Sequence, residues 1–146
     1  MTHPSETGHI SLTAYIDGAC RGNPGPAACA AVILCDGQTV LEAGEFLGES
    51  TNNRAEYRAL LLALSRAAEF PNCRRLTVMT DSQLMARQVR GEYKIRDDEL
   101  RALKREADAL IAKFDRFEIH DIRRKNNAIA DRLANKFLDA GLEKSR

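Results

Sequence analysis

The sequence contains no tryptophan and no long apolar run. A helix that spans a bilayer needs about 20 consecutive apolar residues, so a membrane-spanning helix is excluded as an interpretation. Residues 1–9 are polar and lack the apolar stretch of a signal peptide. We therefore expect a soluble, cytoplasmic protein without a membrane partner.

The four cysteines lack the spacing of a metal site, because they form neither a C-x-x-C pair nor a cysteine–histidine pattern typical of zinc. Cys29 and Cys35 are expected on one strand, too far apart to bond each other. Cysteines of a cytoplasmic protein are normally reduced. We expect all four to be structural thiols: Cys20, Cys29, Cys35 and Cys73.

An excess of positive charge is also missing, because 22 basic residues face 21 acidic ones and the formal net charge is +1. Proteins that bind nucleic acids are usually basic overall. Near-neutrality does not exclude such a partner, because clustered acidic residues can offset local basic patches. It predicts binding that is weak and sensitive to salt.

Hydrophobic patterning predicts five strands: residues 9–17, 27–34, 39–47, 76–80 and 117–122. The second is a nearly continuous apolar run, which is typical of a strand buried on both faces. Asp36-Gly37 predicts a tight hairpin after it. Residues 21–26 contain two glycines and two prolines and are expected to form a loop.

Helical spacing of apolar residues predicts four helices: residues 53–70, 82–90, 97–114 and 127–140. Asn53 with Glu56 resembles a capping box at the start of the first helix. Gly91 and Gly141 are expected to end the second and the last helix.

The order of these elements predicts an α/β fold with a five-stranded mixed sheet and helices on both faces. A hairpin and short connections make the first three strands an antiparallel meander, whereas strands 1, 4 and 5 are parallel because helices connect them. No repeat or linker interrupts the 146 residues, which suit one domain. We expect this domain over residues 10–141, with flexible tails at 1–9 and 142–146.

Four acidic residues each lie in a short motif: Asp17 in YIDGACRGNPGP, Glu56 in TNNRAE, Asp81 in TDSQ and Asp131 in NAIADRLA. Asp17 and Asp81 end predicted strands, and ligands of open α/β sheets bind at the carboxyl ends of strands. Each residue also has a structural alternative. These alternatives are a turn aspartate, a capping-box glutamate, a helix N-cap and a solvated helical aspartate, in that order.

If the fold brings these residues together, at least three negative charges share one cavity. A divalent cation can compensate such a cluster, and ligation by oxygen alone favours Mg²⁺ or Mn²⁺. Hydrolysis of a phosphodiester needs an activated water, a stabilised leaving oxygen and a neutralised phosphorus centre. Two divalent cations about 3.5–4 Å apart can supply all three, and the carboxylates are then ligands rather than proton carriers.

The four motifs and their order resemble the ribonuclease HI family over residues 11–140. The resemblance implies an endonuclease that hydrolyses the RNA strand of RNA–DNA hybrids and leaves 3′-hydroxyl and 5′-phosphate ends. It implies two Mg²⁺ ions, with Mn²⁺ as a possible substitute. Asp17 would bridge both ions, Glu56 and Asp81 would hold nucleophile-side or shared sites, and Asp131 would complete one. The sequence does not fix which carboxylate binds which ion.

The resemblance also places substrate contacts along the minor groove of the hybrid. Recognition of RNA needs groups that meet the 2′-hydroxyl, and amides can both donate and accept. The candidate contacts are Gly18, Cys20, Arg21, Asn23, Asn52, Asn53 and Gln83. The alternative is turn and cap chemistry, especially for Asn53. We expect a monomer without a protein partner.

Two departures from many relatives are visible. Residues 121–127 contain no histidine, and Arg124 stands seven residues before Asp131. Because arginine is permanently charged, it suits clamping of a phosphate or release of product, although a solvated basic turn is the alternative. A basic protrusion is also missing, and only a modest phosphate-facing patch is predicted in its place: Lys94, Arg96, Arg101, Lys104 and Arg105.

Two other functions stay open. One is a nuclease of the same fold that also cuts double-stranded RNA, and the other is a catalytically silent module that binds hybrids. The intact acidic set argues against the silent module, because clustered charges without metal ions would only destabilise the protein.

Overall fold

Strand β1 (Ile10–Cys20) lies at the centre of a five-stranded sheet with the order β3-β2-β1-β4-β5. The computed structural model describes residues 9–145, so residues 1–8 of the expected N-terminal tail lie outside the described residues. The other strands are β2 (Gly25–Cys35), β3 (Gln38–Ser50), β4 (Cys73–Thr80) and β5 (Arg116–Asp121).

The first three strands form the expected antiparallel meander, and β4 pairs in parallel with both β1 and β5. The apolar run of β2 is buried throughout residues 27–33, which confirms a strand covered on both faces. Asp36 and Gly37 have φ angles of 51° and 79°. Positive φ at both central residues is the geometry of a tight hairpin turn, as predicted.

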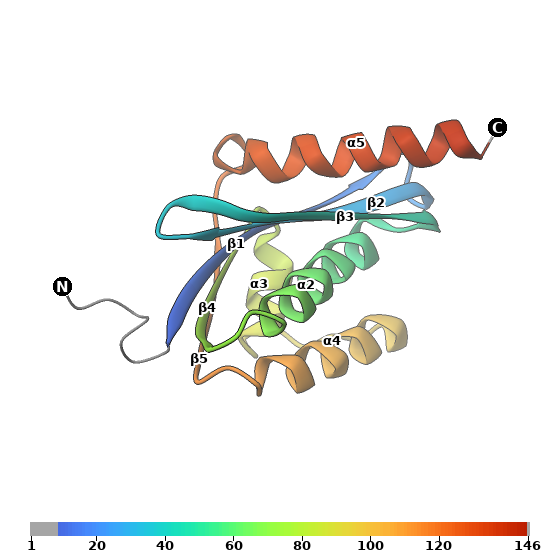
Figure 1. Ribbon diagram of the computed structural model, residues 1–146. Helices are drawn as coiled ribbons and strands as arrows, with labels where there is room; N and C mark the ends of the chain where they lie inside the picture. The colour runs from blue at the N-terminus through green and yellow to red at the C-terminus, as the bar shows by residue number, and fades with distance from the viewer. Residues whose placement is uncertain (1–8, 146) are drawn as a thin grey trace.

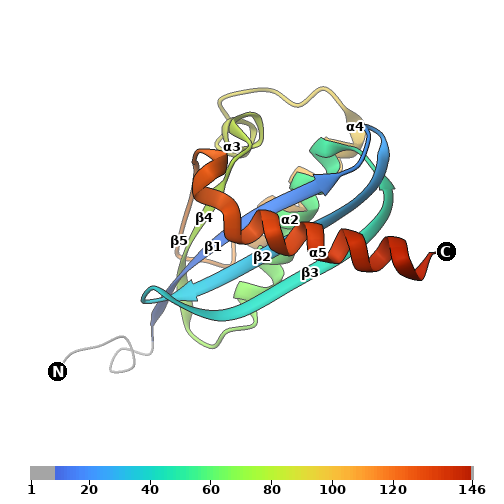
Figure 2. The same cartoon turned by 90° about the horizontal axis from the view of Figure 1, so that it is seen from above.

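Helices cover both faces of the sheet (Figure 1). They are α2 (Asn52–Ala68), α3 (Gln83–Val89), α4 (Asp98–Ile111) and α5 (Ala128–Lys144), and the 3₁₀ turn η1 (Arg124–Asn127) precedes α5. Helix α5 alone lies across β1, β2 and β3 on one face, and the other three helices lie on the opposite face (Figures 1 and 2). The sequence-based prediction of a mixed sheet between helices is confirmed.

The main core lies between the sheet and α2, where Leu12, Ile16, Leu60 and Leu64 are fully buried. On the opposite face, Leu138 of α5 is also fully buried. No helix within residues 9–145 is both long enough and apolar enough to cross a membrane.

The start of α2 differs from the prediction. Thr51 is the N-cap, and its Oγ1 accepts a hydrogen bond from the N–H of Arg54 at 3.2 Å. Threonine satisfies one of the unpaired N–H groups of the first turn, so Asn53 is not needed there. The expected capping box between Asn53 and Glu56 is therefore wrong.

The end of α5 differs as well. The helix continues through Gly141 to Lys144, so residues 142–144 of the expected flexible tail are helical. A Cβ at position 141 would overlap the ring of Phe46 on β3. Gly141 thus permits close packing of α5 on the sheet and does not stop the helix.

Candidate active site

Asp17 and Asp81 occupy equivalent positions on neighbouring parallel strands. The last paired residues of β1 and β4 are Tyr15 and Met79, and each aspartate stands two residues further along its own chain. Beyond this point β1 continues beside β2 alone. The β1–β4 ladder therefore ends just before the two aspartates, and both line one cavity.

Helix α2 brings Glu56 to the same place, because residue 18 is glycine. A Cβ on Gly18 would lie 2.7 Å from the backbone carbonyl carbon of Ala55, so only glycine allows this approach. The N–H of Gly18 donates a hydrogen bond to Glu56 Oε1 at 3.2 Å. Glu56 therefore faces β1 and is not a capping-box partner.

The three carboxylates form one tight group. Oxygen atoms of Asp17, Glu56 and Asp81 all lie within 4.8 Å of one another, and Asp17 is only 5% exposed. They line a cavity of about 440 Å³. The other lining residues are Gly18, Ala19, Cys20, Asn52, Asn53, Ser82, Arg124, Asp131 and Asn135.

Burial and mutual repulsion keep these carboxyl groups from ionising together. Burial raises the pKa of Asp17 well above its ordinary value, and the negative charges of Glu56 and Asp81 raise it further. Burial also raises the pKa of Glu56, and Asp81 adds to this, whereas the Gly18 N–H and the charge of Arg124 oppose it. Removal from water and nearby like charges both favour the neutral form of a carboxyl group.

The donor set fits a divalent cation. Glu56 Oε2 is buried, and no residue in the described part of the chain donates a hydrogen bond to it. A buried carboxylate oxygen without a partner is costly unless something else compensates it. Oxygen ligands from three carboxylates, one of them otherwise unpaired, are what Mg²⁺ and Mn²⁺ bind in proteins.

Asp131 lies in the first turn of α5 and lines the same cavity outside the tight group. Asn135, one helical turn later, donates from Nδ2 to the Asp131 carbonyl at 2.9 Å and to Oδ1 at 3.3 Å. Asp131 is close enough to Asp17 to contribute to the raised pKa of that residue. All four predicted acidic residues therefore meet at one cavity.

Comparison with known proteins places the chain in a family. A family described as reverse transcriptase-like matches residues 15–137. The ribonuclease HI of Halobacterium salinarum is 41% identical over 140 residues, which are 95% of this chain and 69% of that protein. The chain belongs to the ribonuclease HI family. The class of enzyme expected from the sequence, a ribonuclease H, is confirmed with it.

Solved structures of ribonucleases H share the fold. The RNase H1 of Halobacterium salinarum superposes with a TM-score of 0.85 at 43% identity, covering 89% of this chain and 98% of that one. The N-terminal RNase H domain of Rv2228c from Mycobacterium tuberculosis gives 0.89 at 34% identity, covering 94% and 99%. This chain spans 35% of the full Rv2228c, which is described as a bifunctional protein.

A third related structure contains nucleic acid. LC11-RNase H1 in complex with an RNA/DNA hybrid has a TM-score of 0.83 at 34% identity, and the match covers 90% of this chain and 99% of that one.

The residues expected to contact substrate in this ribonuclease H divide into two groups. Gly18, Cys20, Asn52 and Asn53 line the acidic cavity. Among the described residues, three others do not line it: Arg21, Asn23 and Gln83.

Arg21 and Asn23 have partners elsewhere. Arg21 forms an ion pair with Asp139 on α5, and Asn23 Oδ1 accepts a hydrogen bond from the N–H of Asn52 at 3.1 Å.

Sequence reasoning missed Ser82 and Asn135 as lining residues, although both have a local signal. Ser82 caps α3 by accepting from the N–H of Met85 at 3.2 Å, so the alternative role of Asp81 as N-cap is wrong. Asn135 follows Asp131 by four residues, which places both on the same face of a helix.

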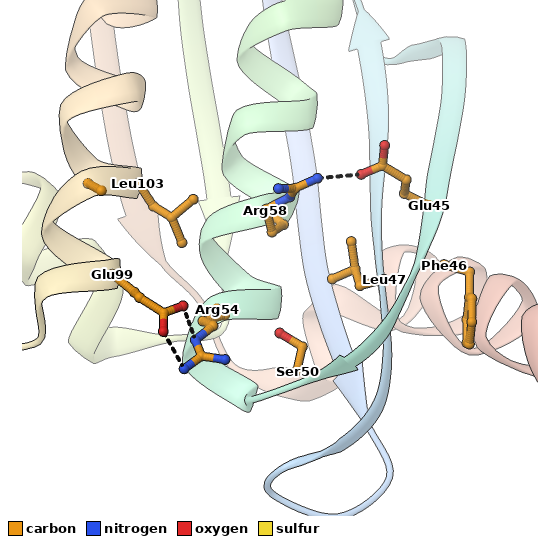
Figure 3. A pocket seen from close by; sticks show the side chains of 9 residues that line it. Glu45, Phe46, Leu47, Ser50, Arg54, Arg58, Glu99 and Leu103 are labelled. Carbon is orange, nitrogen blue, oxygen red and sulfur yellow. Dashed lines mark hydrogen bonds and ion pairs between the residues drawn. The ribbon is translucent and has the colours of Figure 1, made fainter.

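A larger cavity of about 490 Å³ lies between β3, α2 and α4, and its cations already have partners (Figure 3). Arg54 donates from Nη2 to Glu99 Oε1 at 3.0 Å, and its Nε lies 2.9 Å from Oε2. Arg58 approaches Glu45 at 3.4 Å. This cavity therefore lacks the uncompensated charge of the acidic one.

The expected basic patch near α4 is partly neutralised in the same way. Arg101 forms an ion pair with Asp98, and Lys104 forms one with Asp108 at 2.8 Å. Its contact with phosphates stays a prediction.

Proposed function

We propose that this ribonuclease H hydrolyses the RNA strand of RNA–DNA hybrids with two divalent cations held at the acidic cavity. The observation that carries the proposal is the group of Asp17, Glu56 and Asp81, whose oxygen atoms lie within 4.8 Å of one another. The hybrid bound to LC11-RNase H1, a protein of the same fold, supports this choice of substrate.

The carboxylates of Asp17, Glu56 and Asp81 would hold the cations, and Asp131 at the cavity wall would complete one site. Cations bound there would activate a water and stabilise the leaving oxygen. Attack of water on phosphorus with departure of the 3′ oxygen gives 3′-hydroxyl and 5′-phosphate ends. The four side chains act as ligands, and we assign none of them a proton-transfer role.

Discrimination of RNA from DNA is assigned to the cavity wall. The backbone of Gly18 and Cys20 and the amides of Asn52 and Asn53 lie there and can meet a 2′-hydroxyl. Thr51 takes the capping role, and the exposed Asn53 side chain makes no hydrogen bond to any described residue. Asn53 therefore has its amide available for the substrate.

Arg124 is assigned to the phosphate rather than to the cations. It lies at the start of η1 and lines the same cavity as the carboxylates. A guanidinium can bind two phosphate oxygens at once, which suits a role in holding substrate or releasing product.

Cleavage of labelled duplexes tests the proposal. RNA–DNA hybrid, double-stranded RNA and double-stranded DNA are each incubated with Mg²⁺, Mn²⁺ or EDTA. We expect cleavage of the RNA strand of the hybrid with either metal, none in EDTA, and 5′-phosphate on the products. Equal cleavage of double-stranded DNA overturns the assignment, cleavage of double-stranded RNA favours the broader nuclease, and binding without cleavage favours the silent module.

We further propose a cytoplasmic monomer without a protein partner. Asp17, Glu56, Asp81 and Asp131 all belong to one copy of the chain and line one cavity, so a single copy supplies the proposed cation ligands. Light scattering during size-exclusion chromatography tests the oligomeric state, and a stable dimer contradicts it.

A further inference from the structure

Asn127 is a polar side chain that is completely buried at the junction of η1 and α5 (0% exposed). It is the N-cap residue of α5, where asparagine normally accepts a hydrogen bond from an N–H of the first turn. Here its side chain makes no capping bond. The chain therefore forgoes a stabilising interaction that this residue type usually provides.

The Asn127 side chain turns toward the sheet instead. Its Nδ2 donates to the carbonyl of Ile16 at 2.8 Å and lies 3.4 Å from Asp81 Oδ2. The shorter bond fixes the orientation of the amide, and the longer one is weak by its length. Ile16 directly precedes Asp17, so a single amide group joins the β1 backbone to the carboxylate that follows β4.

This contact lies just beyond the last β1–β4 pair, which joins Tyr15 to Met79. Beyond the end of this ladder, Asn127 bridges the β1 backbone at Ile16 and the side chain of Asp81. The backbone of Asn127 also leads into α5, which carries Asp131 one turn later. One residue is thus linked to three elements that each present a carboxylate to the cavity.

The chemistry of the position suits an amide and little else. An aspartate would add negative charge beside Asp81, and an alanine would leave the Ile16 carbonyl without a donor. The cost of the arrangement is visible at Asn127 Oδ1, which is buried without a partner in the described part of the chain. Buried polar atoms are almost always paired, so the donor contacts, not the acceptor, determine this orientation.

We propose that Asn127 is a positioning residue that holds the Asp81 carboxylate against the end of β1 for cation binding. It acts through Asp81 and the backbone of Ile16 and does not touch the reacting phosphate. The inference rests on the proposed function, because it names a residue that prepares the same cavity.

Two substitutions with a matched pair of controls test the role. Asn127→Asp keeps the shape and removes the donor, whereas Asn127→Ala removes the whole amide. Asn126 is the neighbouring, exposed asparagine, and its side chain contacts no described residue through a hydrogen bond. Asn126→Asp and Asn126→Ala therefore control for charge and for composition at nearly the same place.

The readouts are Mn²⁺ affinity of the apo protein by calorimetry, and kcat and KM for the hybrid. Loss of groups that orient metal ligands typically weakens metal affinity or activity about 10–100-fold. We expect such a loss of Mn²⁺ affinity and of kcat at fixed metal for Asn127→Ala, and such a loss of kcat for Asn127→Asp, whose added negative charge offsets part of the loss of cation affinity; KM should stay within about twofold in both. Both Asn126 variants should match the wild type.

Asn127→Ala combined with Asp81→Asn distinguishes a role in positioning Asp81 from a general effect on the stability of the protein. If Asn127 acts through Asp81, Asn127→Ala should weaken Mn²⁺ binding in the wild-type background and add little in the Asp81→Asn background. An equal loss in both backgrounds, or an unchanged Mn²⁺ affinity despite lower stability in EDTA, overturns the proposal.

If Asn127→Ala does not fold, Asn127→Ser replaces it, and the serine variant should also bind Mn²⁺ more weakly than wild type. Mn²⁺ titration does not depend on the substrate. A wild-type protein that binds Mn²⁺ but leaves hybrids intact would therefore refute the proposed function and still leave the role of Asn127 measurable.

Discussion

The N–H of Gly18 donates a hydrogen bond of 3.2 Å to Glu56 Oε1, so the residue after Asp17 holds the carboxylate of another element. This bond forms only because position 18 has no side chain, since a Cβ there would lie 2.7 Å from the backbone of Ala55. Glycine at this position therefore sets the distance between β1 and α2, and with it the separation of two proposed metal ligands.

Gly18→Ala should lower both stability and activity. The new methyl group must push α2 away, and overpacking of this kind costs about 1–3 kcal/mol. Displacement of Glu56 should reduce turnover at least about tenfold, as for other disturbed metal ligands. Urea unfolding and hybrid cleavage measure the two effects.

The control is Gly48→Ala, which lies outside the acidic cavity and has a φ of 70° with open space around it. It should lose stability through backbone strain while keeping normal turnover. A Gly18→Ala enzyme that cleaves at the wild-type rate would show that Glu56 does not depend on this contact.

Asp17→Asn and Asp81→Asn should each abolish cleavage and leave the apo protein at least as stable as wild type. Each change removes a proposed metal ligand and also relieves repulsion within the buried cluster. Melting temperatures in EDTA test the predicted stability of the apo protein, and cleavage assays in Mg²⁺ test the predicted loss of activity. Asp36→Asn, in the remote hairpin turn, should alter neither. Near-normal turnover of Asp17→Asn or Asp81→Asn would contradict the assignment of the acidic cavity as the active site.

The stability of the apo protein should fall as pH rises. Burial and the neighbouring carboxylates raise the pKa of Asp17 to about 9, and burial and Asp81 raise that of Glu56 to about 7. A raised pKa in the folded state means that the unfolded chain ionises first. The stabilising effect is therefore complete below about pH 4, decreases above it and is lost once pH has passed through the raised values.

Urea unfolding in EDTA at pH 5, 7 and 9 measures this trend. Asp17→Asn should give a flatter profile, because the group with the largest shift is gone. Added Mg²⁺ should restore stability at pH 9, since cations stabilise the ionised cluster. Parallel profiles for wild type and Asp17→Asn would show that the cluster does not govern the pH dependence.

The meeting of Asp17 and Asp81 could be predicted from the sequence because it depends on local patterns. Strand periodicity places each residue at the end of a strand, and parallel neighbours bring such ends together. Glu56 was also expected near this edge, but the reason for its orientation was not, because the contact of Gly18 with Ala55 joins segments far apart in the chain.

The missed features all depend on long-range packing. The local sequence does not distinguish a glycine that ends a helix from one that leaves room for a neighbouring side chain. At Gly141 that neighbour is the ring of Phe46 on β3, which is distant in the sequence. The ion pair of Arg21 with Asp139 could not be foreseen either, because the partner is 118 residues away; contact of Arg21 with substrate stays a prediction. The side chain of Asn127 donates to the Ile16 carbonyl of β1, 111 residues earlier, instead of capping α5, and no local pattern encodes this contact.

Gly141→Ala should destabilise the protein, against the usual rule for helices. A helical glycine normally costs about 1 kcal/mol relative to alanine, so the substitution would stabilise a freely exposed helix. Here the Cβ would overlap the ring of Phe46, and we expect a loss of about 1–3 kcal/mol. Urea unfolding of Gly141→Ala, alone and with Phe46→Ala, measures the coupling. A stabilised single variant contradicts the packing described here.

Arg124 should serve turnover rather than cation binding. It lines the acidic cavity, and its positive charge lowers the pKa of Glu56, so it is a neighbour of the carboxylates and not a ligand. Lysine at this position keeps the charge but loses the paired donors of the guanidinium, and alanine loses both. We expect kcat to decrease in the order wild type, Arg124→Lys, Arg124→Ala.

Metal titration separates this role from that of the four carboxylates. The Mg²⁺ midpoint of Arg124→Ala should stay near that of wild type or move to lower concentration, because removal of a nearby positive charge cannot weaken cation binding electrostatically. Arg123→Ala and Lys125→Ala are matched controls, since both residues are exposed and neither lines the cavity. If Arg124→Ala equals wild type at saturating Mg²⁺ and hybrid, η1 is only a connector to the Asp131 helix.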